Sequence, residues 1–426
     1  MKVNLIIPPD PFLGDDKRNP PLGLLYLAAI TKDMGYDVGV TDLRGIDEKD
    51  LIANLPTGQD VYGLTSSTPS YYNASMLAKA IKAQSPNSLT VLGGIHATSL
   101  PRKIGHEFDK VVIGEGEKAF LQILEDFQRK NNPNKKFYKA DPIKELDFIP
   151  FPARDLVPLD SVFSKNAFSV DGEYAGTLIT SRGCPYDCSF CGSQTMWGKK
   201  VRFRSPENVV QELKEIIGNY RIKHFRFQDD TMSLIKKRLK FLCEGMGPLE
   251  IHWRATTRVN RADLETLKMM KQAGCEEIGY GIESLDQEVL NRNHKGIKLN
   301  QVYKAMENTK KVGLQSRLFF IIGLPGEKPG FAKRLEKFLD ETNPEGVDVS
   351  TMVPYPGSPI FHSPAKFGIK LKPMEFEKYH MTLGMIDGER ERPLTFIHDV
   401  LSEEQIIEER EDSLKIILER KQVRNF

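Results

Sequence analysis

The sequence of 426 residues lacks several features that would place it in a common class of protein. It has no apolar run of about eighteen residues, which argues against a transmembrane helix. Its formal net charge is only +2, so no overall field favours nucleic acid or an anionic membrane as a partner. The apolar stretch Val3–Ile7 is too short for a signal peptide and instead predicts a first buried strand. We therefore expect a cytoplasmic protein with neither a membrane nor a nucleic-acid partner.

Cysteine is scarce and unevenly distributed along the chain. There are only five cysteines, an odd number, and none precedes Cys184. Three of them lie within eight residues, a pattern that favours a metal or redox site in a reducing compartment over a disulfide framework. Cys243 and Cys275 lie far from that group, and we expect them to be buried small apolar residues. Histidine is scarce too, and none lies between His106 and His224.

The composition that is present, 40% hydrophobic and 28% charged residues, is typical of a soluble globular protein of about two or three domains. Residues 1–128 alternate short β-branched runs with helical patterns, which predicts βαβ units in a doubly wound parallel sheet, a Rossmann-type α/β fold. Such a sheet binds ligands at the carboxyl ends of its strands. The expected strands are Val3–Ile7, Asp37–Thr41, Val61–Leu64, Thr90–Leu92 and Lys110–Ile113, and the expected helices include Leu22–Met34 and Asn73–Gln84.

A change in composition predicts a linker over residues 129–174. Its first part, Arg129–Lys136, is polar and charged, and the proline-rich Ile149–Pro152 is typical of an extended connector. Residues 175–358 again alternate strands and helices, and six such units predict a partial (β/α)6 barrel whose reactive face is the carboxyl end of its strands. Residues 359–426 are expected to be a short helical C-terminal extension. The expected barrel strands are Ala175–Thr180, His224–Gln228, Glu250–Ala255, Glu277–Ile282, Ser316–Ile322 and Asp348–Val353.

The three clustered cysteines follow the first barrel strand with the spacing CxxxCxxC. Thiolates so spaced in one loop can bind three corners of a 4Fe–4S cluster, because soft sulfur ligands favour iron–sulfur chemistry. The fourth iron then lacks a protein ligand and can bind a small molecule. Zinc is the competing interpretation, but a structural zinc site requires four ligands and no fourth lies near in the sequence. We therefore predict that the metal ligands and catalytic core are Cys184, Cys188 and Cys191.

This spacing, with the aromatic Phe190 just before the last cysteine, resembles the signature of the radical S-adenosylmethionine (SAM) superfamily. Further motifs occur in order and resemble the branch whose members carry an N-terminal cobalamin-binding domain. The resemblance extends from the N-terminal region to about residue 365. The motifs are Thr180–Pro185, Phe227–Asp230, Trp253–Arg258, Ala273–Cys275, Gly281–Ser284, Gly323–Glu327 and Pro354–Pro359.

The resemblance implies that the open iron chelates SAM and that an electron from the cluster cleaves its sulfonium, which releases a 5′-deoxyadenosyl radical. Phe190 would contact the adenine, and Glu283 would bind the ribose hydroxyls or the methionine moiety. Asp229 and Asp230 would lie where the family's acidic or polar group meets the substrate amine. The alternative is structural: the two aspartates, and Glu283 with Ser284, could simply cap the helices that follow.

Two arginines, Arg258 and Arg317, are implied as candidates for the carboxylate of the cofactor. Their alternative is an ordinary ion pair with a surface acid. The two tryptophans, Trp197 and Trp253, are expected to pack rather than to form a substrate platform.

The loops at the carboxyl ends of the first sheet resemble those of the cobalamin domain in this branch. Glycines allow a close approach of backbone to ligand, and hydroxyl groups supply hydrogen bonds to its polar groups. His96 is expected to contact the nucleotide tail of cobalamin or to pack. The residues expected to bind cobalamin are Thr65, Ser66, Ser67, Thr68, Gly93, Gly94, Gly114 and Glu115.

One departure from the cobalamin pattern follows the second strand. Many such domains carry Asp-x-His-x-x-Gly there, whose histidine coordinates cobalt from below, but the matching stretch Thr41–Asp47 contains no histidine. Several cobalamin-dependent radical enzymes share this absence, and it suits methyl transfer to a carbon radical. It also allows a degenerate domain that binds no cobalamin.

We therefore predict a radical SAM enzyme that uses cobalamin to methylate an unactivated carbon. A substrate radical would take the methyl group from methylcobalamin, and a flavodoxin or ferredoxin type of electron donor would reduce the cluster. The substrate is expected to be a small molecule or peptide. The alternatives are ring formation or rearrangement without methyl transfer, and a non-enzymatic cobalamin or cluster sensor. A methylthiotransferase is disfavoured because no cysteine precedes Cys184.

Overall fold

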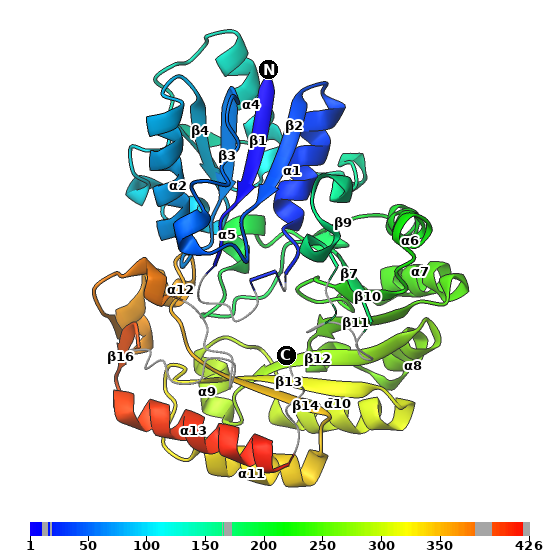
Figure 1. Cartoon of the computed structure of the whole chain (residues 1–426). Coiled ribbons are helices and arrows are strands. Elements are labelled where there is room, and N and C mark those ends of the chain that lie inside the picture. Colours follow the sequence, from blue (N-terminus) through cyan, green and yellow to red (C-terminus); the bar gives the residue numbers. More distant parts are fainter. Residues whose placement is uncertain (11–15, 18, 164, 166–172, 380–393, 421–426) are drawn as a thin grey trace. The chain divides into compact units, whose positions relative to one another are not determined.

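The computed structural model describes residues 1–10, 16–17, 19–163, 165, 173–379 and 394–420 (Figure 1). These residues form two compact units. The first unit comprises Met1–Phe163 and Gly192–Gly198, together with residues 375–379 from the C-terminal part of the chain. The rest of the described chain forms the second unit.

The first unit is built on a sheet of six parallel strands in the order β2-β1-β3-β4-β5-β6. Because β1 lies between β2 and β3, the strand order reverses beside β1, and the carboxyl ends of β1 and β3 flank the usual ligand crevice of such sheets. The strands are β1 (Lys2–Ile7), β2 (Asp37–Asp42), β3 (Val61–Thr65), β4 (Leu89–Gly93), β5 (Lys110–Ile113) and β6 (Phe137–Lys139), and the helices are α1 (Leu22–Asp33), α2 (Tyr71–Gln84), α3 (Ile95–Ser99) and α4 (Gly116–Gln128).

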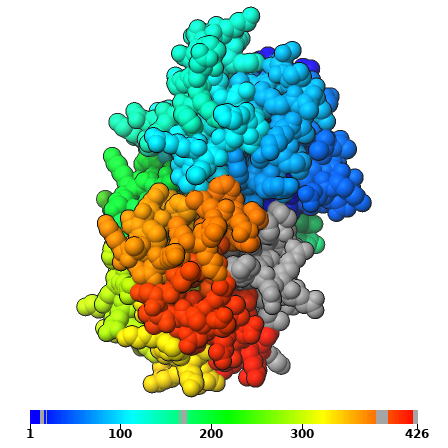
Figure 2. Space-filling model, turned by 90° about the vertical axis from the view of Figure 1, so that its left-hand side faces the viewer, coloured from blue at the N-terminus to red at the C-terminus, as the bar shows by residue number. Residues whose placement is uncertain are grey.

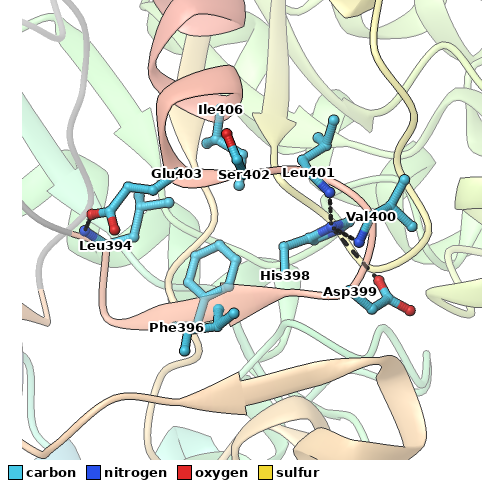
Figure 3. A pocket seen from close by; sticks show the side chains of 10 residues that line it. Leu394, Phe396, His398, Asp399, Val400, Leu401, Ser402, Glu403 and Ile406 are labelled. Carbon is cyan, nitrogen blue, oxygen red and sulfur yellow. Dashed lines mark hydrogen bonds and ion pairs between the residues drawn. The ribbon is translucent and has the colours of Figure 1, made fainter.

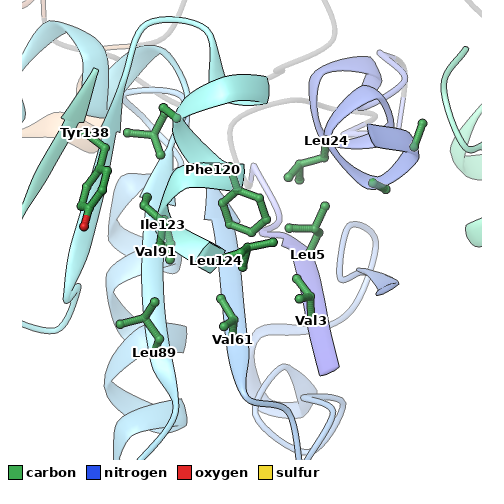
Figure 4. Packing of buried hydrophobic residues seen from close by; sticks show 14 of the residues in the cluster. Val3, Leu5, Leu24, Val61, Leu89, Val91, Phe120, Ile123, Leu124 and Tyr138 are labelled. Carbon is green, nitrogen blue, oxygen red and sulfur yellow. The ribbon is translucent and has the colours of Figure 1, made fainter. Parts of the chain in front are cut away.

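Apolar side chains on both faces hold this sheet between its helices. On one face, Val3, Leu5 and Val61 pack against Phe120 of α4 and Leu24 of α1 (Figure 4). A second cluster with Ile6, Tyr62 and Leu64 packs against α2 on the other face. Strands buried on both faces have continuous apolar runs, which explains why the sequence located β1, β3, β4 and β5 to within one residue at either end. The edge strand β2 is only half-buried, and its alternating valines located it equally well.

The predicted linker, residues 129–174, is largely part of the first unit and contains the sixth strand. β6 pairs in parallel with β5, and Tyr138 in its centre is fully buried, with its hydroxyl donating to Asp126 at 2.9 Å. The polar run before it concealed a strand of only three residues, because one buried side chain produces no periodic pattern.

The second unit is built on six parallel strands in the order β14-β13-β12-β11-β10-β7. β7 and β14 lie at the two edges, so the sheet stays open as a partial barrel. The strands are β7 (Ala175–Leu178), β10 (His224–Phe227), β11 (His252–Thr257), β12 (Cys275–Glu283), β13 (Gln315–Ile322) and β14 (Gly346–Thr351). The helices are α6 (Pro206–Tyr220), α7 (Lys236–Met246), α8 (Leu264–Gln272), α9 (Gln287–Arg292), α10 (Leu299–Val312) and α11 (Phe331–Thr342).

The two faces of this sheet differ in polarity. The helix-covered face is apolar: the ring of Phe320 contacts Phe331 and Phe338 of α11, and the buried Tyr280 bonds to Thr309 of α10. The other face carries buried charges in pairs across neighbouring strands. These pairs are Arg254 with Glu277 at 3.0 Å, and Arg317 with Asp348 at 2.5 Å.

The C-terminal extension adds a short helix, a two-stranded antiparallel sheet and a long helix. The long helix packs against α11, and Figure 2 shows it in red on the surface of this unit. Ile406 and Ile417 of this helix are buried, whereas Ile407 is exposed. None of the described helices combines the length and the apolar character that crossing a membrane requires. The elements are α12 (Pro359–His362), β15 (Ile369–Leu371), β16 (Phe396–His398) and α13 (Glu403–Glu419).

Candidate active site

The three clustered cysteines lie in one loop beyond the carboxyl end of β7. The loop begins after the short strand β8 (Ser181–Arg182), which pairs with β9 (Arg202–Phe203), and Gly183 turns the chain with φ +103°. Cys184, Cys188 and Cys191 are all partly exposed free thiols. Burial raises the pKa of the Cys184 thiol, and the nearby Asp230 also raises it, while Arg258 acts in the opposite direction.

The donor set fits a cluster better than a single metal ion. Among the described residues, no three histidine, cysteine or acidic side chains lie close enough to share one ion. A cubane cluster binds thiolates at separate corners, so its ligands need not converge on a point. Three accessible thiols in a firmly anchored loop are therefore suitable ligands for a 4Fe–4S cluster.

Ser189, between the last two cysteines, anchors the loop to the end of α9. Its hydroxyl donates to Oδ1 of Asn293 at 2.8 Å, and its backbone N–H donates to the carbonyl of Asn293 at 3.0 Å. Asn293 is itself fixed by donating to the carbonyls of Val289 and Pro325, at 2.9 and 3.0 Å. Ile360 donates its N–H to the carbonyl of Ser189 at 2.9 Å. Sequence reasoning missed this anchor, because its residues carry no reactive group and lie far apart in the chain.

Arg258 lies beside the sulfur of Cys188. Its Nη1 is 3.7 Å from Cys188 Sγ, and its guanidinium carbon lies 3.7 Å from the centre of the Tyr186 ring. Its Nη2 donates to the carbonyl of Lys295. The resemblance implied a contact with the carboxylate of the cofactor, whereas the structure places this guanidinium against a predicted cluster ligand.

Glu283 ends β12 in a strained conformation with φ +73° and forms a buried ion pair with Lys295 at 2.7 Å. The ammonium of Lys295 is also 5.9 Å from the centre of the Phe190 ring. A Cβ at Gly281 would lie only 2.5 Å from the Glu283 carboxylate and 3.0 Å from Lys295 Nζ, so a larger residue there would displace this pair. Glu283 does not cap the next helix, because Asp286 caps α9. Lys295 had no motif to reveal it in the sequence.

Asp229 is bonded to the two residues that lead into the cysteine loop, Thr180 and Ser181. It is buried, and it accepts hydrogen bonds from the N–H of Thr180 at 3.1 Å, the hydroxyl of Thr180 at 2.8 Å and the hydroxyl of Ser181. Asp230 is exposed and close enough to Cys184 to raise the pKa of that thiol. Neither aspartate caps a helix, since α7 begins only at Lys236.

Arg317, predicted to contact the carboxylate of the cofactor, is paired with an acid on the neighbouring strand. It lies in the first half of β13, and both its Nε and its Nη2 donate to Asp348 on β14, at 2.5 and 3.0 Å. A bidentate pair of this kind holds the guanidinium against the sheet. The sequence could not reveal it, because the register between the two strands determines which acid faces the arginine.

The predicted cobalamin residues gather at the carboxyl edge of the first sheet. Ser66 is buried, and its hydroxyl has no hydrogen-bond partner among the described residues. Such an orphaned donor fits a polar group of a bound ligand. The remaining residues lie at or just after the ends of β3, β4 and β5: Thr65, Ser67 and Thr68, then Gly93 and Gly94, then Gly114 and Glu115.

Several of these residues have structural partners. Ser67 bonds to Asp10 and Ser70 at 3.1 and 2.9 Å, and Glu115 accepts from the N–H of Ile143 at 3.4 Å. Gly94 has φ +94°, and a Cβ there would meet the backbone of Ser66 at 2.7 Å. These contacts shape the loops, while the Ser66 hydroxyl remains for a ligand.

His96 is fully buried beside this edge. Its Nδ1 lies 3.3 Å from the Thr68 hydroxyl, its ring stacks on Tyr71 at 4.3 Å, and Phe376 meets it edge-on at 4.7 Å. Burial lowers the pKa of His96 to about 4, so the ring is neutral near pH 7. His96 therefore packs in an aromatic cluster, one of the two roles expected for it.

The stretch without the cobalt-binding histidine contains a buried ion pair. Arg44 donates to both carboxylate oxygens of Asp42, at 2.9 and 2.7 Å, and also to the carbonyls of Asn19 and Ser161. Burial alone would raise the pKa of Asp42, but Arg44 outweighs it and the pKa lies below its ordinary value. Asp42 thus holds the loop, and this loop has no histidine that could bind cobalt.

A cavity of about 300 Å³ in the second unit lies between β16 and α13 (Figure 3). His398 in its wall accepts from the N–H groups of Val400 and Leu401, both at 3.0 Å, and its Nε2 is 3.0 Å from the carbonyl of Leu324. Both ring nitrogens of His398 are therefore hydrogen-bonded to backbone groups. The cavity is lined by none of the predicted site residues.

Comparisons with known proteins agree with both units. The model of the radical SAM superfamily matches residues 178–339, and that of the B12 binding domain matches residues 16–124. An uncharacterised methyltransferase of Pyrococcus horikoshii is 33% identical over 392 residues, which cover 85% of this chain and 82% of the relative. The anaerobic magnesium-protoporphyrin IX monomethyl ester cyclase of Rubrivivax gelatinosus is 27% identical, over 85% of this chain and 68% of the relative.

A solved structure extends the likeness to the fold. The radical SAM methyltransferase TsrM of Kitasatospora setae, with cobalamin and a 4Fe–4S cluster bound, matches with a TM-score of 0.70 and 16% identity. The match covers 88% of this chain and 77% of that one. At this identity the likeness shows a shared fold alone.

Proposed function

Because the chain belongs to the radical SAM superfamily, in the branch with an N-terminal B12-binding domain, we propose that it methylates an unactivated carbon of a small molecule. The observation that carries this proposal is the anchored loop with three accessible thiols, which lies beside the Glu283–Lys295 pair. The methyltransferase name of the Pyrococcus relative favours methylation over other radical reactions.

The side chains around the cysteine loop suit a bound cluster and SAM. When bound, the cluster with SAM supplies a 5′-deoxyadenosyl radical and cobalamin supplies a methyl group. Cys184, Cys188 and Cys191 would hold three irons of the cluster and leave the fourth open. Phe190 would contact the adenine, while Glu283 and Lys295 offer opposite charges to the polar groups of SAM.

The first unit would contribute the binding site for cobalamin. The buried Ser66 hydroxyl would donate to a polar group of the nucleotide tail, and Gly93 and Gly114 leave room for close approach at the same edge. A one-electron donor of the flavodoxin or ferredoxin type would reduce the cluster. We propose that neither nucleic acid nor a membrane is a partner of this chain.

A second candidate function is radical ring formation without methyl transfer. It is favoured by the cyclase of Rubrivivax gelatinosus, which aligns with 85% of this chain. The fold serves both reactions, so only the product distinguishes them.

The test is anaerobic reconstitution of the full chain with iron, sulfide and cobalamin, followed by incubation with trideuteromethyl-SAM, a reductant and a metabolite extract. Methylation predicts 5′-deoxyadenosine together with a metabolite that carries the labelled methyl group. A consumed metabolite whose product lacks the label would support the cyclase reaction and refute methylation. If the wild type forms no more 5′-deoxyadenosine than Cys188→Ala, radical chemistry is excluded and a sensor role is favoured.

A further inference from the structure

We propose that Arg258 donates a hydrogen bond to the thiolate of Cys188 and thereby raises the reduction potential of the cluster. The inference rests on the cluster that the proposed function requires, but not on the substrate or on methyl transfer. It gives Arg258 a role different from the carboxylate contact that the resemblance implied.

The guanidinium of Arg258 is held in position by three contacts. Its plane lies over the Tyr186 ring, with 3.7 Å between the guanidinium carbon and the ring centre. Nη2 donates to the carbonyl of Lys295, and Nη1 is 3.7 Å from Cys188 Sγ. An N–H to sulfur contact is normally longer than one to oxygen, because sulfur is the larger atom. The stacking and the carbonyl together leave Nη1 directed at the sulfur.

The charge of Arg258 needs a partner that the described carboxylates do not provide. The side chain is buried with 5% exposure, and no described acid forms an ion pair with it. The nearby Glu283 is paired with Lys295, and Asp229 is bonded to Thr180 and Ser181. A buried cation is stable only when an anion compensates it. A thiolate that binds iron is the anion within reach.

A fixed cation beside a cluster ligand changes the energy of reduction. The oxidised cluster takes up one electron from an external one-electron reductant, no bond to the protein breaks, and the negative charge of the cluster and its thiolates increases. A cation and a hydrogen bond at Cys188 stabilise this more negative state more than the oxidised one. Removal of Arg258 should therefore make the cluster harder to reduce.

The experiment is a redox titration of the reconstituted full chain, followed by electron paramagnetic resonance, without SAM, cobalamin or substrate. For Arg258→Met we expect at least about a tenfold loss in the equilibrium for reduction, which is ~59 mV for one electron. Arg258→Lys keeps the charge but loses the planar guanidinium with its paired N–H donors. Its reduction potential should lie between those of Arg258→Met and the wild type. Arg261→Met is the matched control, because the exposed side chain of Arg261 donates to the Tyr186 hydroxyl at 3.1 Å and has no described contact with a cysteine sulfur.

An unchanged potential in Arg258→Met, with full iron and sulfide content, would overturn the proposal. If SAM affinity falls while the potential without SAM stays unchanged, Arg258 serves the cofactor carboxylate, and the proposal is equally wrong. If Arg258→Met fails to retain a cluster, Arg258→Lys and Tyr186→Leu decide the question, since each weakens the contact and must lower the potential. A failure of methylation in any variant leaves this measurement unaffected.

Discussion

The side chain of Asn293 is predicted to hold the cysteine loop closed, and Asn293→Ala tests this. Its Oδ1 accepts the hydroxyl of Ser189 at 2.8 Å, and both residues are fully buried. The truncation leaves a buried hydroxyl without its acceptor, which costs about 1–3 kcal/mol. The backbone bond from Ser189 N–H to the Asn293 carbonyl remains, so the amide of Ser189 reports how often the loop opens.

We expect the free energy of local opening at Ser189 to fall by ~2 kcal/mol, which makes its amide exchange ~30-fold faster. Hydrogen–deuterium exchange of the cluster-free chain measures this rate, and iron content after reconstitution should fall with it. Ser189→Ala deletes the same hydrogen bond, so the double variant should open little more than Asn293→Ala alone.

Asn308→Ala is the matched control for Asn293→Ala. Asn308 is a buried asparagine on α10 that donates to the carbonyl of Ala262 at 3.2 Å. It should destabilise the second unit without a selective effect on Ser189. Equal exchange at Ser189 in wild type and Asn293→Ala would refute the anchoring role.

Three further changes test other parts of the molecule. Arg44→Met should destabilise the first unit by ~3–5 kcal/mol in denaturant titrations, because it leaves the buried carboxylate of Asp42 without its partner. Since the pKa of Asp42 lies below 3.8 in the folded chain, its contribution to stability is present above that pH and disappears as the pH falls further. Ser66→Ala should weaken cobalamin binding about fivefold in equilibrium titrations, the loss of one hydrogen bond. Glu327 is fully buried, and burial raises its pKa from 4.5 to about 8. The stability of the second unit should therefore fall as the pH rises between these values, and Glu327→Gln should abolish that slope.

Each of these changes has its own control and contrary outcome. Asp42→Asn combined with Arg44→Met should cost less than Arg44→Met alone, and equal costs would show that the buried charge is not the cause. Ser67→Ala controls for Ser66, since its hydroxyl already bonds to Asp10, and equal losses of cobalamin affinity would contradict a specific contact. A pH slope that persists in Glu327→Gln would assign the titration to another group.

The architecture was predictable because its signals are local. Parallel strands show as short β-branched runs, and all eleven expected strands are present, five in the first sheet and six in the second. Of the strands in these two sheets, only β6 was missed. β6 offered no such run, since only Tyr138 of its three residues is buried. The expected and observed strand ends differ by no more than two residues, because hydrogen bonds rather than side-chain type determine where a strand ends.

The site divides along the same line. The cysteine spacing and the missing histidine after β2 are properties of contiguous residues, so the sequence by itself was enough to predict the cluster ligands and to show that this loop has no histidine for cobalt. The partners of Arg258, Arg317 and Asp229 lie 70, 31 and 49 residues away. Only the tertiary structure decided that Asp229 bonds to the start of the cysteine loop, that Arg317 pairs across the sheet and that Arg258 lies beside the sulfur of Cys188. The reason is that strand register and loop packing bring distant groups within hydrogen-bond distance.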